Sequence, residues 1–245
     1  VQSASYFATA AIDILALANV DTVIFGSESS NIEKLQQFAT ELQSISLDER
    51  TISTVRQYEN KLGALLPNDI LGINYIQAAK KHQIQTRCIQ RTNAYHSKHI
   101  DSHIASASAI RHHFFNGDDV TPYTILANEL DPNARLHTYY PYLQTRLLLD
   151  DPKRMKQLFL MDEGIEHSLI DAAKRFDDMD SFLSYCISAR YTRSRIQRTL
   201  IHYLLDTSKQ EANLHAKAEH LRVLAFNTKS RVLLKQLQKE GKAVI

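Results

Sequence analysis

The feature that most constrains the fold is an alternation of short apolar runs with helical patterns in the first part of the chain. Residues 22–25 form a continuous apolar run, as expected for an interior parallel strand, and residues 85–91 indicate the next strand. The stretches with apolar residues at helical spacing are 6–18, 32–42, 53–65 and 67–81. Strands that alternate with helices predict part of a doubly wound parallel sheet, and hence an α/β fold.

After residues 117–122, almost every segment has a helical pattern. The predicted helices cover residues 123–130, 143–149, 153–160, 163–175, 180–189, 192–206 and 229–239. The sequence Gly-Asp-Asp-Val-Thr-Pro at 117–122 marks the predicted boundary. Because 245 residues suffice for two cores, we predict an α/β domain at residues 1–117 and a mostly α-helical domain at residues 118–245.

Composition excludes several classes of protein. The formal net charge of +2 is too small to indicate nucleic-acid binding by itself, so any basic surface must come from local clustering. No apolar run reaches membrane-spanning length and no signal peptide is visible, so we expect a cytoplasmic protein without a membrane partner. Cys88 and Cys186 lie in stretches expected to be core, which is typical of buried thiols in a reducing compartment.

Three histidines are the main candidates for a metal site. His96, His99 and His103 could share one helix face and bind zinc. The Ser and Lys residues between them indicate a loop, and no Cys or carboxylate cluster completes a ligand set. We therefore predict no metal held by the chain's own side chains.

The segment Ile104–Arg111 predicts a phosphate-binding helix start. Ser106 and Ser108 stand among small residues, where a hydroxyl can cap a helix whose free N–H groups and dipole attract anions. Arg111, one turn later, adds a fork-shaped donor that suits phosphate. The alternative is an ordinary capped helix with an exposed Arg.

Six motif segments follow one another along the chain: residues 21–28 (Asp-Thr-Val-Ile-Phe-Gly-Ser-Glu), 67–72, 89–91 (Ile-Gln-Arg), 106–111, 190–198 and 221–226. In this order they resemble the bacterial tRNA(Met) cytidine acetate ligase family, part of the nucleotidyltransferase superfamily. Ser106, Ile110 and Arg111 match the family's Ile-Ser-Ser-Thr-x-Ile-Arg motif, with Ala107 in place of Ser and Ser108 in place of Thr. The resemblance covers nearly the whole chain, and its strength is the ordered set of motifs, each of which is weak alone.

The resemblance implies an ATP site in a nucleotide-binding domain at residues 1–117. Gly26, Asn68 and Arg91 match family positions that contact ATP, and the Ser106–Arg111 motif implies further contacts from Ser106, Ser108 and Arg111. Gly26 follows a strand, where ligands of open α/β sheets bind and where a missing Cβ lets adenine or ribose approach the backbone. The alternatives are a turn glycine, a helix cap at Asn68 and a surface Arg91.

The activity that the resemblance implies joins acetate to ATP, releases pyrophosphate and passes the acetyl group to the wobble cytidine N4 of elongator tRNA(Met). Mg²⁺ would neutralise the leaving pyrophosphate. Such chemistry needs positioning and charge stabilisation, not an acid–base pair. Glu28 and Asp69 could form a carboxylate pair, but helix capping and solvation explain both residues.

One departure from the family concerns its His-x-x-His or His-x-Gly-His signature, which belongs near the N-terminus. We do not find it in the segment that begins Val1-Gln-Ser-Ala-Ser. We expect the chain to be a fragment without the first strand, the signature loop and the first helices, and to be inactive by itself.

The predicted helix near residues 192–206 has a basic face. Arg195, Arg198 and His202 share one side of a helical wheel, and Ile196, Leu200, Tyr203 and Leu204 share another. With Arg193, which starts the helix, Arg195 and Arg198 are the predicted tRNA-binding residues. The alternative is a solvated basic face.

Two other functions stay open from sequence. One is a nucleotidyltransferase that acts on a small molecule and needs no basic helical face. The other is a non-catalytic RNA-binding fragment. Binding of tRNA separates the ligase from the first, and binding of ATP separates both enzymes from the second.

Overall fold

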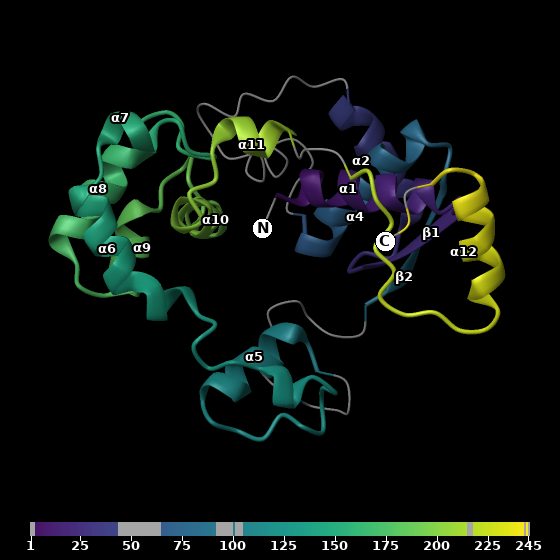
Figure 1. Cartoon of the computed structure of the whole chain (residues 1–245), viewed down its shortest axis with the longest axis horizontal. Helices are drawn as coiled ribbons and strands as arrows, with labels where there is room; N and C mark the ends of the chain where they lie inside the picture. Colours follow the sequence, from purple (N-terminus) through teal and green to yellow (C-terminus); the bar gives the residue numbers. More distant parts are fainter. Residues whose placement is uncertain are drawn as a thin grey trace. The chain divides into compact units, whose positions relative to one another are not determined.

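The computed structural model describes residues 3–43, 65–91, 100, 105–214, 218–242 and 244. They form two compact units, which we describe separately. The sheet unit draws on three stretches of the chain, within residues 2–46, 64–90 and 212–245, and the helical unit on residues 91–211. Figure 1 labels the elements of both units.

The sheet unit is built on two parallel strands. β1 (Thr22–Ser27) pairs with β2 (Gln85–Gln90), in a register that runs from Thr22 opposite Gln85 to Ser27 opposite Gln90. The helices of this unit are α1 (Ala4–Leu17), α2 (Ile32–Gln43), α4 (Pro67–Lys81) and α12 (Ser230–Lys239). The chain crosses over between these parallel strands through α2 and α4, as parallel pairing requires. The predicted α/β arrangement with a parallel sheet is confirmed.

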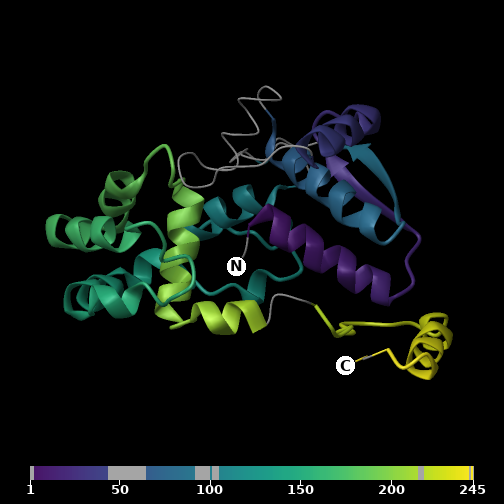
Figure 2. The ribbon, with the colours of Figure 1, turned by 90° about the horizontal axis from the view of Figure 1, so that it is seen from above.

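Helix α4 is the centre of the sheet unit. It packs against α1, α2 and both strands, and Figure 2 shows α1 (purple) alongside α4 (blue). Ile70, Ile73 and Ile76 are buried, as the sequence predicts. At Gly72 the helix comes so close to β1 that a Cβ atom would lie 2.5 Å from Cε2 of Phe25. This contact fixes how the start of α4 meets the end of β1.

The opposite face of the sheet is uncovered among the described residues. Ile24 and Ile89 are each 60% exposed. Cys88 lies opposite Phe25 in the strand register, on the α4 side of the sheet, and is only partly buried, so its predicted burial is wrong; Cys186 in the helical unit is buried as expected. One face of a sheet is shielded from water only where a second layer packs on it, which explains the exposure of Ile24 and Ile89.

The helical unit contains α5 (Ala107–Phe115), α6 (Tyr140–Leu149), α7 (Pro152–Met155), α8 (Ile165–Arg175), α9 (Met179–Cys186), α10 (Arg193–Leu204) and two short 3₁₀ turns, η1 (Ala127–Glu129) and η2 (Leu136–Tyr139). Leu143, Met155, Leu169, Phe182 and Tyr203 belong to its continuous apolar core. Helix α11 (Lys209–Leu214) continues from this unit into the sheet unit.

Two predicted helices of this unit are wrong. Residues 123–130 contain only the 3₁₀ turn η1, where Ile125 is 99% exposed and so has no apolar layer to pack on. The helix predicted at 153–160 ends at Met155, and Leu158 instead forms an antiparallel bridge with Ser208. The helix predicted at 53–65 lies outside the described residues.

The two units divide the chain differently from the predicted domains. The predicted boundary between residues 117 and 118 falls inside the helical unit, and α12, assigned to the helical domain, belongs to the sheet unit. There Asn19 Nδ2 donates to Glu240 Oε2 at 2.9 Å. The domains of residues 1–117 and 118–245 stay a prediction. Across the described part of the chain, no helix is long and apolar enough to cross a membrane.

Candidate functional site

The carboxyl end of β1 and the start of α4 are joined by Glu28. Its carboxylate accepts hydrogen bonds from the Asn68 backbone N–H (3.3 Å), the Asn68 side-chain amide (2.6 Å) and the Asp69 backbone N–H (3.0 Å). The alternative of a helix cap at Asn68 is therefore wrong, because the position before the helix is Leu66 and the Glu28 carboxylate, just after β1, satisfies the free N–H groups. The expectation that capping explains Glu28 is confirmed.

Asp69, in α4, binds back to the loop after β1. We call this junction of residues 27–29 with the start of α4 the corner at Glu28. The Asp69 carboxylate is buried and accepts from the Ser27 hydroxyl (2.5 Å), the Glu28 N–H (3.1 Å) and the Ser29 N–H (3.3 Å). The expected solvation of Asp69 is wrong, because three donors of the β1 loop replace water around it. The two carboxylates thus hold strand, loop and helix in one conformation.

This corner sets the electrostatics of the candidate site. The start of α4 is a place that attracts anions, and Glu28 already occupies it. A phosphate there would meet a carboxylate instead of free N–H groups. The site suits an uncharged polar group such as a nucleoside.

Gly26 and Asn68 both lie at this corner, and their sharing of one ligand site stays a prediction. Gly26 pairs with Ile89 near the end of β2, and Gln90 Nε2 donates to the Glu28 carbonyl at 2.8 Å. Gly26 and Ser27 belong to the strand, so the expected start of the loop at Gly26 is wrong by two residues. Arg91 follows the last residue of β2 directly.

The predicted helix start at Ser106 is confirmed. Ser106 caps α5, and its hydroxyl accepts from the Ala109 N–H at 3.0 Å, while Ser108 lies in the first turn. Arg111 is exposed on the same helix. Helix α5 belongs to the helical unit, whereas Gly26 and Asn68 belong to the sheet unit, so their convergence on one nucleotide stays a prediction.

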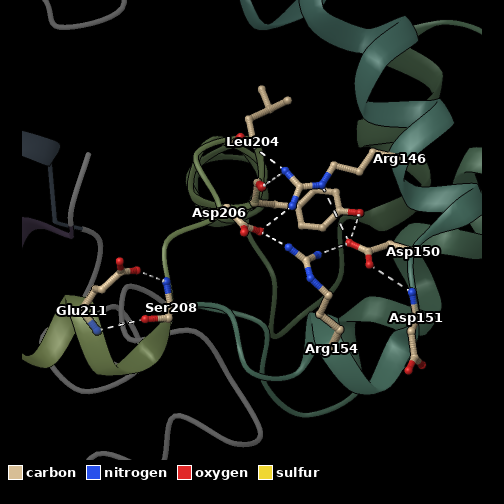
Figure 3. Close-up of polar contacts among 9 residues, drawn as sticks. Arg146, Asp150, Asp151, Arg154, Leu204, Asp206, Ser208 and Glu211 are labelled. Atoms are coloured by element: carbon tan, nitrogen blue, oxygen red, sulfur yellow. Dashed lines mark hydrogen bonds and ion pairs between the residues drawn. The ribbon is translucent and has the colours of Figure 1, made fainter.

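An ion network that none of the sequence motifs indicated holds the end of α10. The Arg146 guanidinium lies 4.5 Å from the Tyr203 ring, donates to the Tyr203 carbonyl at 2.7 Å and bonds Asp206 at 2.5 Å. Arg154 pairs with both Asp150 and Asp206, and Figure 3 shows these side chains pointing at one another. Asp150, which lies four positions from both Arg146 and Arg154, was the available sequence signal.

Helix α10 itself differs from the helical-wheel expectation. His202 is buried, and its ring meets Phe159 edge-on at 4.9 Å, so it does not join Arg195 and Arg198 on an open face. Arg193 pairs with Asp180 of α9. A helical wheel gives the angular order of side chains around a helix but does not show which face of the helix packs against a neighbouring element.

No three metal-ligating side chains converge anywhere in the described ranges. His96, His99 and His103 lie outside the described residues.

With this geometry in place, comparison with known proteins decides the family. The HIGH Nucleotidyl Transferase family matches residues 1–245. The chain belongs to this family. Its relatives include the tRNA(Met) cytidine acetate ligase of Staphylococcus aureus (strain MRSA252), 31% identical over 259 residues, which cover 96% of this chain and 67% of the relative. The protein of the same name from Mycoplasma mobile is 30% identical over 226 residues, which cover 85% of this chain and 75% of the relative.

Solved structures agree on the fold of this HIGH nucleotidyl transferase. The apo crystal structure (form I) of Thermotoga maritima TmcAL has a TM-score of 0.79 at 24% identity, over 100% of this chain and 68% of that one. TmcAL bound with alpha-thio ATP (form II) has a TM-score of 0.75 at 24% identity, over 100% and 67%. The resemblance drawn from the sequence motifs is confirmed.

Proposed function

We propose that this chain belongs to an enzyme that uses ATP to join acetate to the wobble cytidine N4 of elongator tRNA(Met), in the cytoplasm. The observation that carries the proposal is the match of all 245 residues to one nucleotidyl transferase family. Two relatives, 31% and 30% identical to this chain, share the name tRNA(Met) cytidine acetate ligase. That name describes the joining of acetate to a cytidine of tRNA(Met).

The corner at Glu28 supports one orientation of bound ATP, with the nucleoside and the phosphates at different ends of the site. The nucleoside end would lie at Gly26, Asn68 and Arg91, where Glu28 disfavours a phosphate. The phosphates would lie at the start of α5, near Ser106, Ser108 and Arg111, where a capped helix start and an exposed guanidinium favour anions. Mg²⁺, which usually retains water and binds substrate phosphates, would be held mainly through the nucleotide.

The proposed reaction has two steps. An acetate oxygen attacks the α-phosphorus of ATP, the bond to the β-phosphate oxygen breaks, and pyrophosphate leaves with acetyl-adenylate formed. The N4 amine of cytidine then attacks the acetyl carbonyl carbon, AMP leaves with the bonding electron pair, and the amine loses a proton. The chain's contribution is to orient the nucleotide and stabilise charge on the phosphates.

The helical unit would contact tRNA phosphates through the start of α10, the segment with Arg193, Arg195 and Arg198. A base that reacts must leave its stack, and phosphate contacts are the usual means of holding a stem in place meanwhile.

The test is a pair of titrations of the chain, one with ATP and one with a tRNA(Met) transcript. Binding of both supports the proposal. ATP binding without tRNA binding would favour a small-molecule nucleotidyltransferase, and tRNA binding without ATP binding would favour an RNA-binding role alone. Neither titration depends on the predicted lack of catalysis by these 245 residues.

A further inference from the structure

Two guanidinium groups on α10 differ from the other described arginines around them. Arg190 pairs with Glu163 at 3.4 Å, and Arg193 pairs with Asp180. For Arg195 and Arg198, by contrast, the described residues provide no carboxylate within ion-pair distance. The two lie three positions apart on the helix, close enough for Arg195 to act electrostatically on Arg198.

Arg195 is held rigidly. Its guanidinium lies over the Tyr191 ring, 5.1 Å from the ring centre, and its Nε atom is buried without a hydrogen-bond acceptor among the described residues. Tyr191 is itself fixed, because its ring is buried and its hydroxyl donates to the Asp162 carbonyl at 3.1 Å. A buried donor without an acceptor is costly, so an acceptor from outside would be bound favourably.

Arg198 is half-buried, so its charge is also partly removed from water. Burial, and then the like charge of Arg195, lower the pKa of the Arg198 guanidinium. Two close cations that have lost part of their hydration repel each other unless an anion lies between them. The arrangement stores unfavourable energy that a bound anion would release.

We propose that Arg195 and Arg198 together hold one backbone phosphodiester of the RNA substrate, an inference that rests on the proposed function. Planar guanidinium forks match the oxygens of a phosphate bidentately, and one phosphate between two forks neutralises both. Arg193 contributes little, because Asp180 already neutralises it. The three predicted tRNA-binding arginines thus divide into a phosphate-binding pair and an ion-paired neighbour.

The thermal stability of variants distinguishes a phosphate-binding pair, Arg195 and Arg198, from a structural ion pair. A structural ion pair loses a partner when one side chain is replaced, and stability falls. Arg195 and Arg198 have no carboxylate partner to lose in the described part of the chain, so the double variant Arg195→Gln/Arg198→Gln should melt at or above the temperature of the unmodified chain, while binding RNA more weakly. Gains in stability at the expense of function are common at binding sites.

The experiment titrates a tRNA(Met) transcript into the chain at several salt concentrations, with thermal melting of each variant. We expect the double variant to bind about tenfold more weakly or worse, with a salt slope shallower by about one. A matched control, Lys153→Gln/Lys174→Gln, removes two exposed charges elsewhere in the helical unit. This control should bind tRNA within about twofold of the unmodified chain.

Three results would overturn the inference. In the first, the double variant keeps the affinity and salt slope of a chain that does bind tRNA, which leaves the proposed function intact. In the second, the exposed-lysine control weakens binding as much as the double variant. In the third, the double variant loses binding only together with a lowered melting temperature. If the unmodified chain does not bind tRNA at all, the proposed function itself fails.

Discussion

Replacing Gly72 by Ala should destabilise the sheet unit, although alanine is the better helix former. The new Cβ would lie 2.5 Å from Cε2 and 3.1 Å from Cζ of Phe25, against about 3.5–4.0 Å for a normal carbon contact. Overpacking of a core costs about 1–3 kcal/mol. The higher helix propensity of alanine returns about 1 kcal/mol. An overlap of this size belongs at the upper end, so we expect a net loss of about 2 kcal/mol.

The matched background is Phe25→Leu, which removes the ring atoms that Cβ would meet. In that background Gly72→Ala should become neutral or stabilise by up to about 1 kcal/mol, because only helix propensity remains. The two substitutions should therefore be coupled by about 2–3 kcal/mol in a double-mutant cycle. Phe25→Leu alone changes the core modestly, so all four proteins should fold.

Hydrogen exchange of β1 and α4 amides is the suitable assay. It reports the free energy of opening of one unit, whereas spectroscopic unfolding of a chain with two units mixes both. The reasoning is refuted if Gly72→Ala protects these amides in the unmodified background, or if the cycle shows coupling below about 0.5 kcal/mol.

Two further predictions concern the helical unit. Ser106→Ala should destabilise α5 by about 1 kcal/mol and Ser106→Gly by only a few tenths, measured by exchange of α5 amides, and equal effects would contradict a capping role. Hydrogen bonds from Arg154 and Arg146 hold the pKa of Asp206 below its ordinary 3.8. Its contribution to stability is therefore full above about pH 4 and is lost as the pH falls through the lowered pKa. In Asp206→Asn the melting temperature should be lower at neutral pH and fall less between about pH 5 and pH 2; an unchanged acid profile would contradict the ion network.

Local patterns predicted the local structure. The predicted helix at 67–81 has the observed bounds, because Pro67 favours a helix start and Ile70, Ile73 and Ile76 place one apolar face inward. The helix start at Ser106 followed from the same kind of evidence, a hydroxyl that reaches the third N–H along the chain. Such signals depend only on neighbours in sequence.

The unpredicted parts of the site depend on residues far apart in sequence. Glu28 caps a helix that begins about forty residues later, and no residue near Asn68 in the sequence indicates a cap supplied by the segment after β1. The extension of β1 to Ser27 follows from its pairing with Gln90. The buried side of α10 likewise depends on Phe159, which contacts His202. Tertiary contacts of this kind override local preference.

The discontinuity of the sheet unit sets an order for folding. The described residues of the helical unit lie in one stretch, within 91–211, and are synthesised before residues 212–245, which the sheet unit also needs. The pairing of Thr22 with Gln85, and still more the contact of Asn19 with Glu240, close long loops, which costs entropy and slows folding. On the ribosome the helical unit can therefore fold early, while α12 reaches the sheet unit last. Synthesis of α12, and not of the strands alone, sets the earliest time at which the sheet unit around the corner at Glu28 is complete.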